Sequence, residues 1–202
     1  MMAGSALLFL GVYFVLCFAL RSVVQHVRTG STGFKGISGR PGSMEWTGGV
    51  LFVVALALGV LAPVLDLVGV LDPIAALHEE VVQQAGGGMF FGGLVTTLVA
   101  QMAMGKSWRI GVDHSEKTEL VTDGPFSVVR NPIFAGMIPT SLGIALLCPN
   151  IVAVVALVAL IAALEMQTRL IEEPYLLKTH GEVYAGYAAR TGRFFPLIGK
   201  LR

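Results

Sequence analysis

The chain has 202 residues, of which 54% are apolar and only 13% are charged. Soluble domains carry roughly 25% charged residues, so this composition excludes an ordinary soluble domain. The net charge of +1, without a dense basic cluster, argues against nucleic acid as a partner. Because the apolar residues come in long runs, we expect one all-α domain over residues 1–202, a polytopic helical membrane protein.

The first apolar run lies next to the N-terminus, where a secretory signal peptide would also lie. The first cation, Arg21, follows this run and none precedes it. A signal peptide has the reverse order, with its positive charge in front of the apolar region. We therefore expect the run to remain as a membrane span.

Five apolar runs are predicted to cross the membrane, at about residues 5–24, 47–71, 87–104, 133–148 and 151–171. A crossing helix needs about 20 residues, so the fourth run is short. Only residues 149–150 separate it from the fifth. A joint this tight predicts an antiparallel helical hairpin.

The positive charges predict how the protein is oriented. All fourteen Lys and Arg residues fall in or beside the first loop, the third loop and the C-terminal tail, while the second loop carries Asp72, Glu79 and Glu80. Lys and Arg concentrate in cytoplasmic loops, so we expect an outward N-terminus and a cytoplasmic third loop and tail. The tail is amphipathic and suits interfacial helices, with an aromatic anchor at residues 193–196.

Two polar segments, residues 105–136 and 172–197, flank the predicted hairpin and should form the functional site. The first is the longest polar stretch between apolar runs, and connections of this length are uncommon unless they are functional. Within it, Asn131 can cap a helix that begins at Pro132. The free N–H groups of such a helix start can also bind an anion, beside Arg130.

A charged cluster marks the end of the fifth run. Glu165, Arg169, Glu172 and Glu173 are spaced to lie on one helical face. An ionisable residue inside a span is a functional candidate by default, and Arg169 is the natural partner of Glu165. The alternatives are that this pair only neutralises itself against the bundle and that Glu172 and Glu173 form a solvated helix end.

Neither a metal nor a redox site is predicted. Cys17 and Cys148 lie in or beside apolar runs, as small buried hydrophobes do, and His114 and His180 lack ligand spacing. The pair Trp108-Arg109 fits either an interfacial anchor or a site. The residues thus predict a polar pocket at the cytoplasmic boundary, next to a region open to lipid, with these members: Arg109, Arg130, Asn131, Glu172 and Glu173.

Two motifs on either side of the hairpin carry a family resemblance. Residues 120–136 read LVTDGPF, then VRNPIFAG, and the tail has Glu172-Glu173, Gly181-Glu182-x-Tyr184-x-x-Tyr187 and Arg193-Phe194-x-Pro196. Order and spacing over about residues 100–197 resemble the isoprenylcysteine carboxyl methyltransferase family and, more broadly, the membrane methyltransferases that include phospholipid methyltransferases.

The resemblance implies S-adenosyl-L-methionine as the methyl donor. The cofactor-binding residues that it implies are Gly124, Pro125, Arg130, Asn131, Pro132, Phe134, Gly136, Glu172, Glu173, Tyr184, Tyr187 and Arg193. Two positions depart from the family pattern, which has His where this chain has Asn131 and Tyr where it has Phe134. Neither side chain can transfer a proton, although Asn131 can still form hydrogen bonds.

Methyl transfer from a sulfonium is an in-line displacement, so most of the acceleration can come from alignment of donor and acceptor. A carboxylate acceptor, as in isoprenylcysteine, needs only orientation, for which Arg109 or Arg169 is the candidate. An amine acceptor, as in a phospholipid headgroup, needs a base, for which Glu173 is the candidate. Both acceptor classes stay open, and either mechanism requires Arg130 and Glu173 to meet at one site.

Two other hypotheses come from different classes. A non-catalytic scaffold or a small transporter would need no cofactor, and the lack of an inverted repeat argues against the common transporter plans. A sterol-reductase-like enzyme would need a basic patch for a nicotinamide cofactor, which the sequence does not offer. The expected partners are membrane lipids and a lipophilic acceptor, without nucleic acid or metal, and the number of copies is open.

Overall fold

The computed structural model describes residues 2–34, 36–109 and 119–201, and within these ranges it contains helices and no β-strand. The predicted all-α class is confirmed for this part of the chain. The helices in chain order are α1 (Met2–Phe14), α2 (Arg21–Thr29), α3 (Met44–Leu67), α4 (Glu80–Met104), α5 (Pro125–Val128), α6 (Pro132–Leu147), α7 (Ile151–Met166), α8 (Glu173–His180) and α9 (Glu182–Arg190).

Two π-helical segments join helices into longer ones. Segment η1 (Val15–Leu20) connects α1 to α2, and segment η4 (Gln167–Glu172) connects α7 to α8. Single-turn 3₁₀ segments, η2 (Ala75–Leu77) and η3 (Gly105–Ser107), flank α4. π-helical turns are rare and are frequent at functional sites, and both of these contribute residues to the cavity described below.

Within the described residues, four helices are long and apolar enough to cross a membrane: Met2–Thr29, Met44–Leu67, Glu80–Ser107 and Ile151–His180. The protein is therefore an integral membrane protein. Helix α6, the predicted fourth span, has 16 residues, which is shorter than the roughly 20 that a full crossing takes. The count of five crossings stays a prediction.

Helix α4 begins earlier than its apolar run suggests, at Glu80, because the glycines at 86–88 are helical. Of these three glycines, Gly86 packs against α6, whereas Gly87 and Gly88 have open space around them. A Cβ atom added to Gly93 would lie 2.5 Å from the Gly136 carbonyl oxygen, and one added to Gly143 would lie 2.5 Å from the carbonyl oxygen of Gly86. Such distances mean that the two backbones touch, as in small-residue contacts between membrane helices.

The joint between α6 and α7 is fixed by Asn150. Its side chain accepts a hydrogen bond from the Ala153 N–H (3.0 Å), capping α7, and donates one to the Ala62 carbonyl of α3 (3.1 Å). Asn150 is buried, so these bonds hold the turn without help from water. At the other end of α3, Ser43 caps the helix by accepting from the Trp46 N–H (3.2 Å), and α3 therefore starts before the predicted residue 47.

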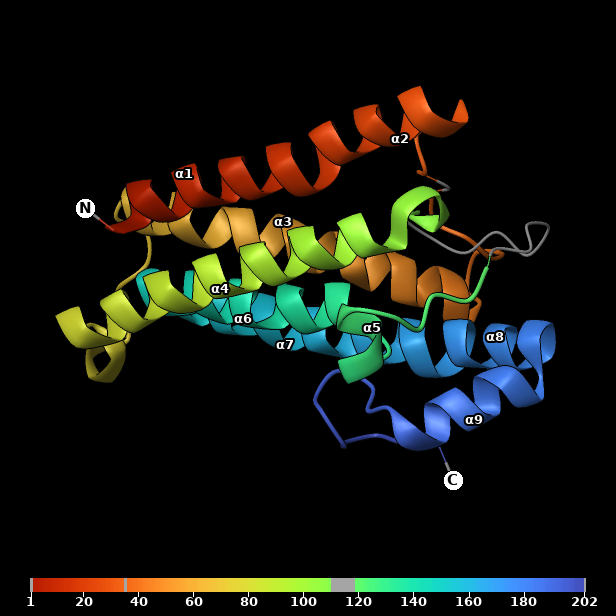
Figure 1. Ribbon diagram of the computed structural model, residues 1–202. Helices are drawn as coiled ribbons and strands as arrows, with labels where there is room; N and C mark the ends of the chain where they lie inside the picture. The colour runs from red at the N-terminus through yellow and green to blue at the C-terminus, as the bar shows by residue number, and fades with distance from the viewer. Residues whose placement is uncertain (1, 35, 110–118, 202) are drawn as a thin grey trace.

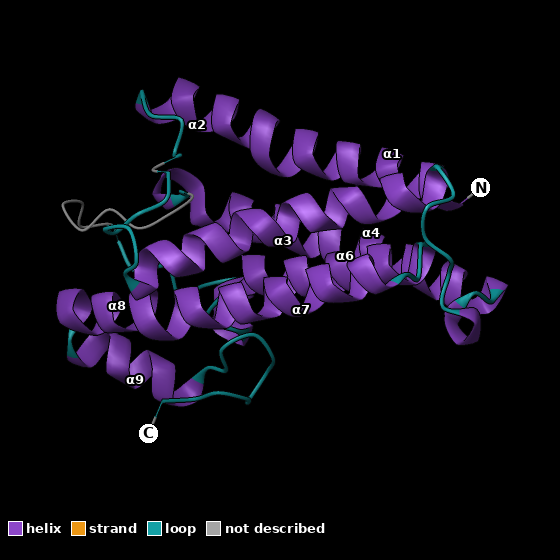
Figure 2. Cartoon of the chain, turned by 180° about the vertical axis from the view of Figure 1, so that it is seen from behind, coloured by secondary structure: helices purple, strands orange, loops and turns teal. Residues whose placement is uncertain are grey.

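The helices form one elongated bundle with chemically different ends (Figure 1). The N-terminus and the acidic connection between α3 and α4 lie at one end, and α2, α8 and α9 lie at the other. None of the described Lys and Arg residues belongs to α1, α3, α4, α6 or α7, or to the connection between α3 and α4 at the first end. The tail folds back along α7 and α8, so that the end of the chain lies beside the bundle (Figure 2).

Candidate functional site

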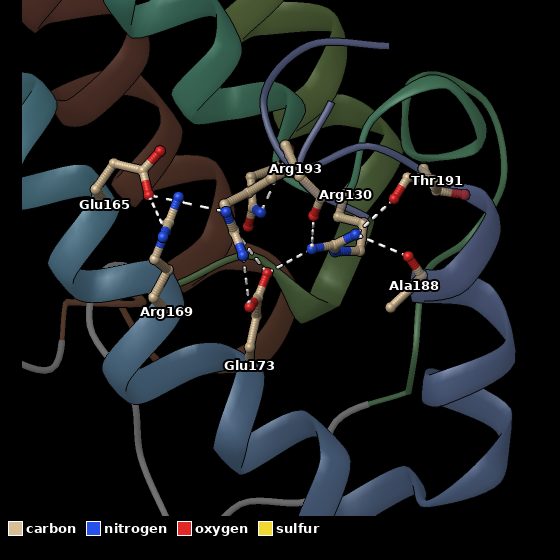
Figure 3. Close-up of polar contacts among 9 residues, drawn as sticks. Arg130, Glu165, Arg169, Glu173, Ala188, Thr191 and Arg193 are labelled. Carbon is tan, nitrogen blue, oxygen red and sulfur yellow. Dashed lines mark hydrogen bonds and ion pairs between the residues drawn. The ribbon is translucent and has the colours of Figure 1, made fainter. Parts of the chain in front are cut away.

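Two distant segments meet in a buried ion pair. Arg130 precedes α6 and Glu173 begins α8, and the Arg130 Nη2 atom lies 2.5 Å from Glu173 Oε1. Their side chains are only 1% and 6% exposed. The structure thus brings together the two residues that the methyltransferase hypothesis requires at one site (Figure 3).

Arg193 completes the cluster from the tail. Its Nε donates to Glu173 Oε1 (2.8 Å) and its Nη2 to Glu173 Oε2 (3.0 Å), a bidentate contact. These bonds raise the pKa of the Arg193 guanidinium above its ordinary value. Both oxygens of Glu173 therefore face guanidinium groups, and the carboxylate holds three segments of the chain together.

The same residues also join backbones. The N–H of Arg130 donates to the Gly192 carbonyl (2.8 Å) and the N–H of Asn131 to the Arg193 carbonyl (3.1 Å). The Arg130 Nη1 atom donates to the carbonyls of Ala188 (3.0 Å) and Thr191 (2.5 Å), which end α9. A cation at a helix C-terminus satisfies free carbonyls and complements the helix dipole, so Arg130 fixes the position of α9.

Tyr187 makes a second link between α9 and the segment before α6. Its hydroxyl donates to the Phe126 carbonyl of α5 at 2.5 Å. Burial raises the pKa of Tyr187 to about 12, so the hydroxyl keeps its proton at neutral pH. Tyr184, one turn earlier, is fully buried beside it, and burial raises its pKa as well. Gly181, with φ of 52°, supplies the left-handed turn that sends α9 back along α8.

A cavity of about 720 Å³ lies between the cluster and the bundle. Small-molecule sites typically measure about 300–1,000 Å³. Its polar end includes Arg109, Glu119, Arg130, Asn131, Glu172 and Tyr184, and its apolar part includes Phe14, Phe18, Phe52, Leu56, Met137 and Leu164. One cavity therefore connects charged groups with the interior of the membrane-spanning bundle.

Nine of the predicted site residues line this cavity: Arg109, Arg130, Asn131, Pro132, Phe134, Glu172, Glu173, Tyr184 and Tyr187. Of the others, Gly124 caps α5 and Pro125 is its first residue. Gly136 lies in the α4–α6 contact, where an added Cβ would be 2.5 Å from Thr97 Oγ1. Arg193 does not line the cavity but donates a hydrogen bond to Glu173, which does. The roles of all of these in cofactor binding stay predictions.

Arg169, a predicted catalytic candidate, points outward. Its side chain is 58% exposed and forms an ion pair with Glu165, one helical turn earlier. Arg193 Nη1 lies 3.9 Å from the same Glu165 carboxylate, which connects this outer pair to the buried cluster (Figure 3). The geometry agrees with the interpretation that Glu165 and Arg169 neutralise each other, and Arg109 is the candidate that faces the cavity.

The two neighbouring carboxylates have different surroundings. Glu173 is engaged by two arginines, whereas Glu172 accepts one long hydrogen bond from Gln167 Nε2 (3.3 Å) and lines the cavity. Arg109 lies near enough to Glu172 for their opposite charges to attract. Glu172 is thus the carboxylate that can bind a ligand in the cavity, whereas Glu173 holds the residues of the cavity wall in place.

The sequence did not reveal the cavity residues that come from the earlier helices. Thr97 and Gln101 line it from α4, and Thr97 Oγ1 lies 3.2 Å from the Tyr13 hydroxyl of α1. Two polar residues four positions apart in an apolar run were the available signal. Trp108 is buried, with the Arg21 guanidinium 4.6 Å from its ring centre, so its ring is a wall of the cavity rather than an interfacial anchor.

The fold and the cavity define a helical membrane protein with a polar site that opens into its bundle. Residues 82–183 match the family described as phospholipid methyltransferase. The chain belongs to this family of membrane methyltransferases, and the predicted resemblance is confirmed.

A curated relative is the nickel-cobalt-cadmium resistance protein NccN of Alcaligenes xylosoxydans xylosoxydans. It is 30% identical over 105 residues, which cover 52% of this chain and 49% of NccN. The chain thus spans about half the length of the curated relative that it matches.

Proposed function

We propose that the protein transfers a methyl group from S-adenosyl-L-methionine to a lipophilic, membrane-associated acceptor. The observation that supports this most directly is the cavity itself, in which Arg109 and Glu172 share one space with Phe14, Phe18 and Leu164 of the bundle. A polar cofactor can bind at the charged end of this cavity while a lipophilic acceptor occupies its apolar part. The family match supplies the reaction class.

The side chains at the polar end fit this cofactor. S-adenosyl-L-methionine carries an ammonium, a carboxylate and an adenine ring, and when bound it supplies an electrophilic methyl group on a sulfonium. Glu172 suits the ammonium, and Arg109 suits a carboxylate through a bidentate contact. Tyr184 and Phe126 offer aromatic faces at the same end. In this assignment Glu173 positions the site through Arg130 and does not touch the reacting atoms.

Alignment is the chemistry that this chain can provide. The apolar walls exclude water and hold the acceptor chain, which leaves its head beside Glu172 and Arg109. A carboxylate acceptor would be oriented by Arg109, and an amine acceptor would give its proton to Glu172 rather than to the doubly paired Glu173. Because both residues are also assigned to the cofactor, the chemical identity of the methylated product, and not a loss of turnover, separates isoprenylcysteine-like carboxylates from phospholipid amines.

The site is proposed to face the cytoplasm. The described cations gather at the end of the bundle that holds α2, α8 and α9 (Figure 1), and cations concentrate in cytoplasmic loops. S-adenosyl-L-methionine would then enter from the cytosol, while the acceptor would enter from the lipid.

Isothermal titration calorimetry of the protein in lipid nanodiscs with S-adenosyl-L-methionine tests the proposal. We expect saturable binding by the wild type, a loss of at least about tenfold in affinity for Glu172→Gln, as removal of one charged hydrogen bond gives, and no change for Arg169→Gln. Transfer of radiolabelled methyl groups into the lipid fraction of membranes then identifies the acceptor class. No detectable heat of binding with folded wild-type protein would overturn the proposal.

A further inference from the structure

The turn after α9 carries an exposed apolar tip. Phe195, Leu197 and Ile198 are 53%, 74% and 66% exposed, and Pro196 lies between them. The neighbouring Phe194 is buried instead, with its ring 6.3 Å from that of Phe134. Of the two aromatic residues in the predicted anchor at 193–196, only Phe195 is exposed, and it belongs to an apolar tip formed by residues 195–198.

Hydrogen bonds within the turn lower the cost of placing its backbone in lipid. The Arg193 N–H donates to the Ile198 carbonyl (2.7 Å), and the Ile198 N–H donates to the Phe195 carbonyl (3.2 Å). A backbone group without a partner is costly in hydrocarbon, and these bonds avoid that cost for the groups involved. Leu197 has a φ of 67°, a left-handed conformation that glycine or asparagine adopts more readily.

The turn lies beside the bundle rather than beyond its end. In both views the chain leaves α9 toward the middle of the bundle, below α6, so that residues 191–199 lie farther from the cation-rich end than α8 does (Figures 1 and 2). The long axes of the candidate spans run in this same direction (Figure 1). Lys200, exposed and next to the tip, can reach lipid phosphates from there.

We infer that residues 195–198 insert into the lipid leaflet at the cation-rich end and that this insertion sets the arrangement of the buried ion cluster. The residues that flank the tip make the connection, since Arg193 binds Glu173 and the Gly199 carbonyl accepts from Arg130 Nη2 (2.9 Å). Movement of the tip would thus move both partners of the Arg130–Glu173 pair. The consequence for cofactor affinity rests on the proposed function, whereas the insertion itself does not.

Fluorescence quenching tests the insertion. A bimane label on Leu197→Cys, in vesicles of phosphatidylcholine and phosphatidylglycerol, should be quenched by nitroxide-labelled lipid and protected from iodide. Val158→Cys on the lipid-facing side of α7 serves as the lipid control, and Glu79→Cys in the acidic connection serves as the water control. The native Cys17 and Cys148 are buried, which limits their labelling. Iodide quenching like that of the water control would overturn the insertion.

A second copy of the chain is the other occupant that this surface could have. Protection from both quenchers, together with a dimer mass in nanodiscs, would show it and would overturn the lipid assignment.

The coupling to the site has its own test. Leu197→Asn keeps a residue that tolerates the left-handed turn but removes the apolar side chain. In vesicles we expect its affinity for S-adenosyl-L-methionine to fall at least about fivefold, a typical lower value for coupled sites. Val183→Gln, an equally exposed position on α9, should leave the affinity unchanged. Equal affinities of Leu197→Asn and wild type would overturn the coupling, and a wild type that binds no cofactor would overturn the proposed function alone.

Discussion

Arg130 and Glu173 are 43 positions apart, yet they form an ion pair with a nitrogen–oxygen distance of 2.5 Å that is almost sealed from solvent. The residues between them build the entire α6–α7 pair and η4. The pair therefore closes a large loop at its base, and Arg193 fastens the tail to the same carboxylate. This arrangement makes Glu173 a structural support for the cavity wall.

Glu173→Gln should destabilise the protein as well as weaken cofactor binding. The change leaves two buried guanidinium groups without their counter-charge, and breaking a buried ion pair in this way costs about 3–5 kcal/mol. Thermal unfolding in detergent, followed by tryptophan fluorescence, measures the loss.

Glu165→Gln is the matched control for this prediction. Glu165 is partly exposed and pairs with the exposed Arg169, and such pairs contribute less than about 1 kcal/mol. Equal melting temperatures for Glu173→Gln and Glu165→Gln would contradict a supporting role of the buried cluster.

Gly136→Val should disrupt helix packing. A Cβ there would lie 2.5 Å from Thr97 Oγ1 and 2.8 Å from the Gly93 carbonyl oxygen, and overpacking of this kind costs about 1–3 kcal/mol. Gly92→Ala, with open space around its added methyl group, should be neutral or slightly stabilising. Unfolding of both variants in detergent separates the two effects. A normal melting temperature for Gly136→Val, with lost cofactor binding, would instead support the role that the family resemblance implies for Gly136.

Patterns that depend on local composition were predictable from sequence. The apolar runs gave the helical class, and the cations marked the end that holds the charged site. The start of α4 was missed because the glycines at 86–88 look like helix breakers, whereas all three are helical and Gly86 is needed for contact with α6. That contact depends on a partner helix far away in the sequence, which no local pattern contains.

The candidate site was predictable where it lies in the two motifs, at Arg130 and at Glu172-Glu173. The different surroundings of the two carboxylates were not, because they depend on which side of η4 faces the cavity. The contribution of α4 was also hidden, since Thr97 and Gln101 lie within an apolar span and carry no motif. Their position became visible only once α1, α4 and η4 were placed around one cavity.

Tyr187→Phe should reduce the loss of folding stability that occurs as the pH rises in the alkaline range. The folded pKa of Tyr187 is about 12, against an ordinary value of 10, so the folded state keeps a proton that the unfolded state loses. Between these values the group's contribution falls by about 1.4 kcal/mol per pH unit as pH rises. Removal of the hydroxyl removes this slope and leaves the Phe126 carbonyl without its donor. Urea unfolding at pH 9 and pH 11 gives the free energy of unfolding of both proteins. If the wild type and Tyr187→Phe lose the same free energy between the two pH values, the burial of this hydroxyl is contradicted.

Asn131→His should give methyl transfer a new dependence on pH. Asn131 lines the cavity, and an amide has no proton to exchange at neutral pH, so we expect the wild-type rate to lack an inflection from this position. An introduced imidazole titrates near pH 6.5 and is a base only when neutral, so the variant's rate should rise with pH through that region if residue 131 contacts the acceptor. Phe134→Tyr, which restores the other family side chain, should show no such inflection because a phenol titrates near pH 10. Rate profiles from pH 5.5 to 8.5 that coincide for wild type and Asn131→His would place residue 131 away from the transferred proton and favour an acceptor that needs no base, such as a carboxylate held by Arg109.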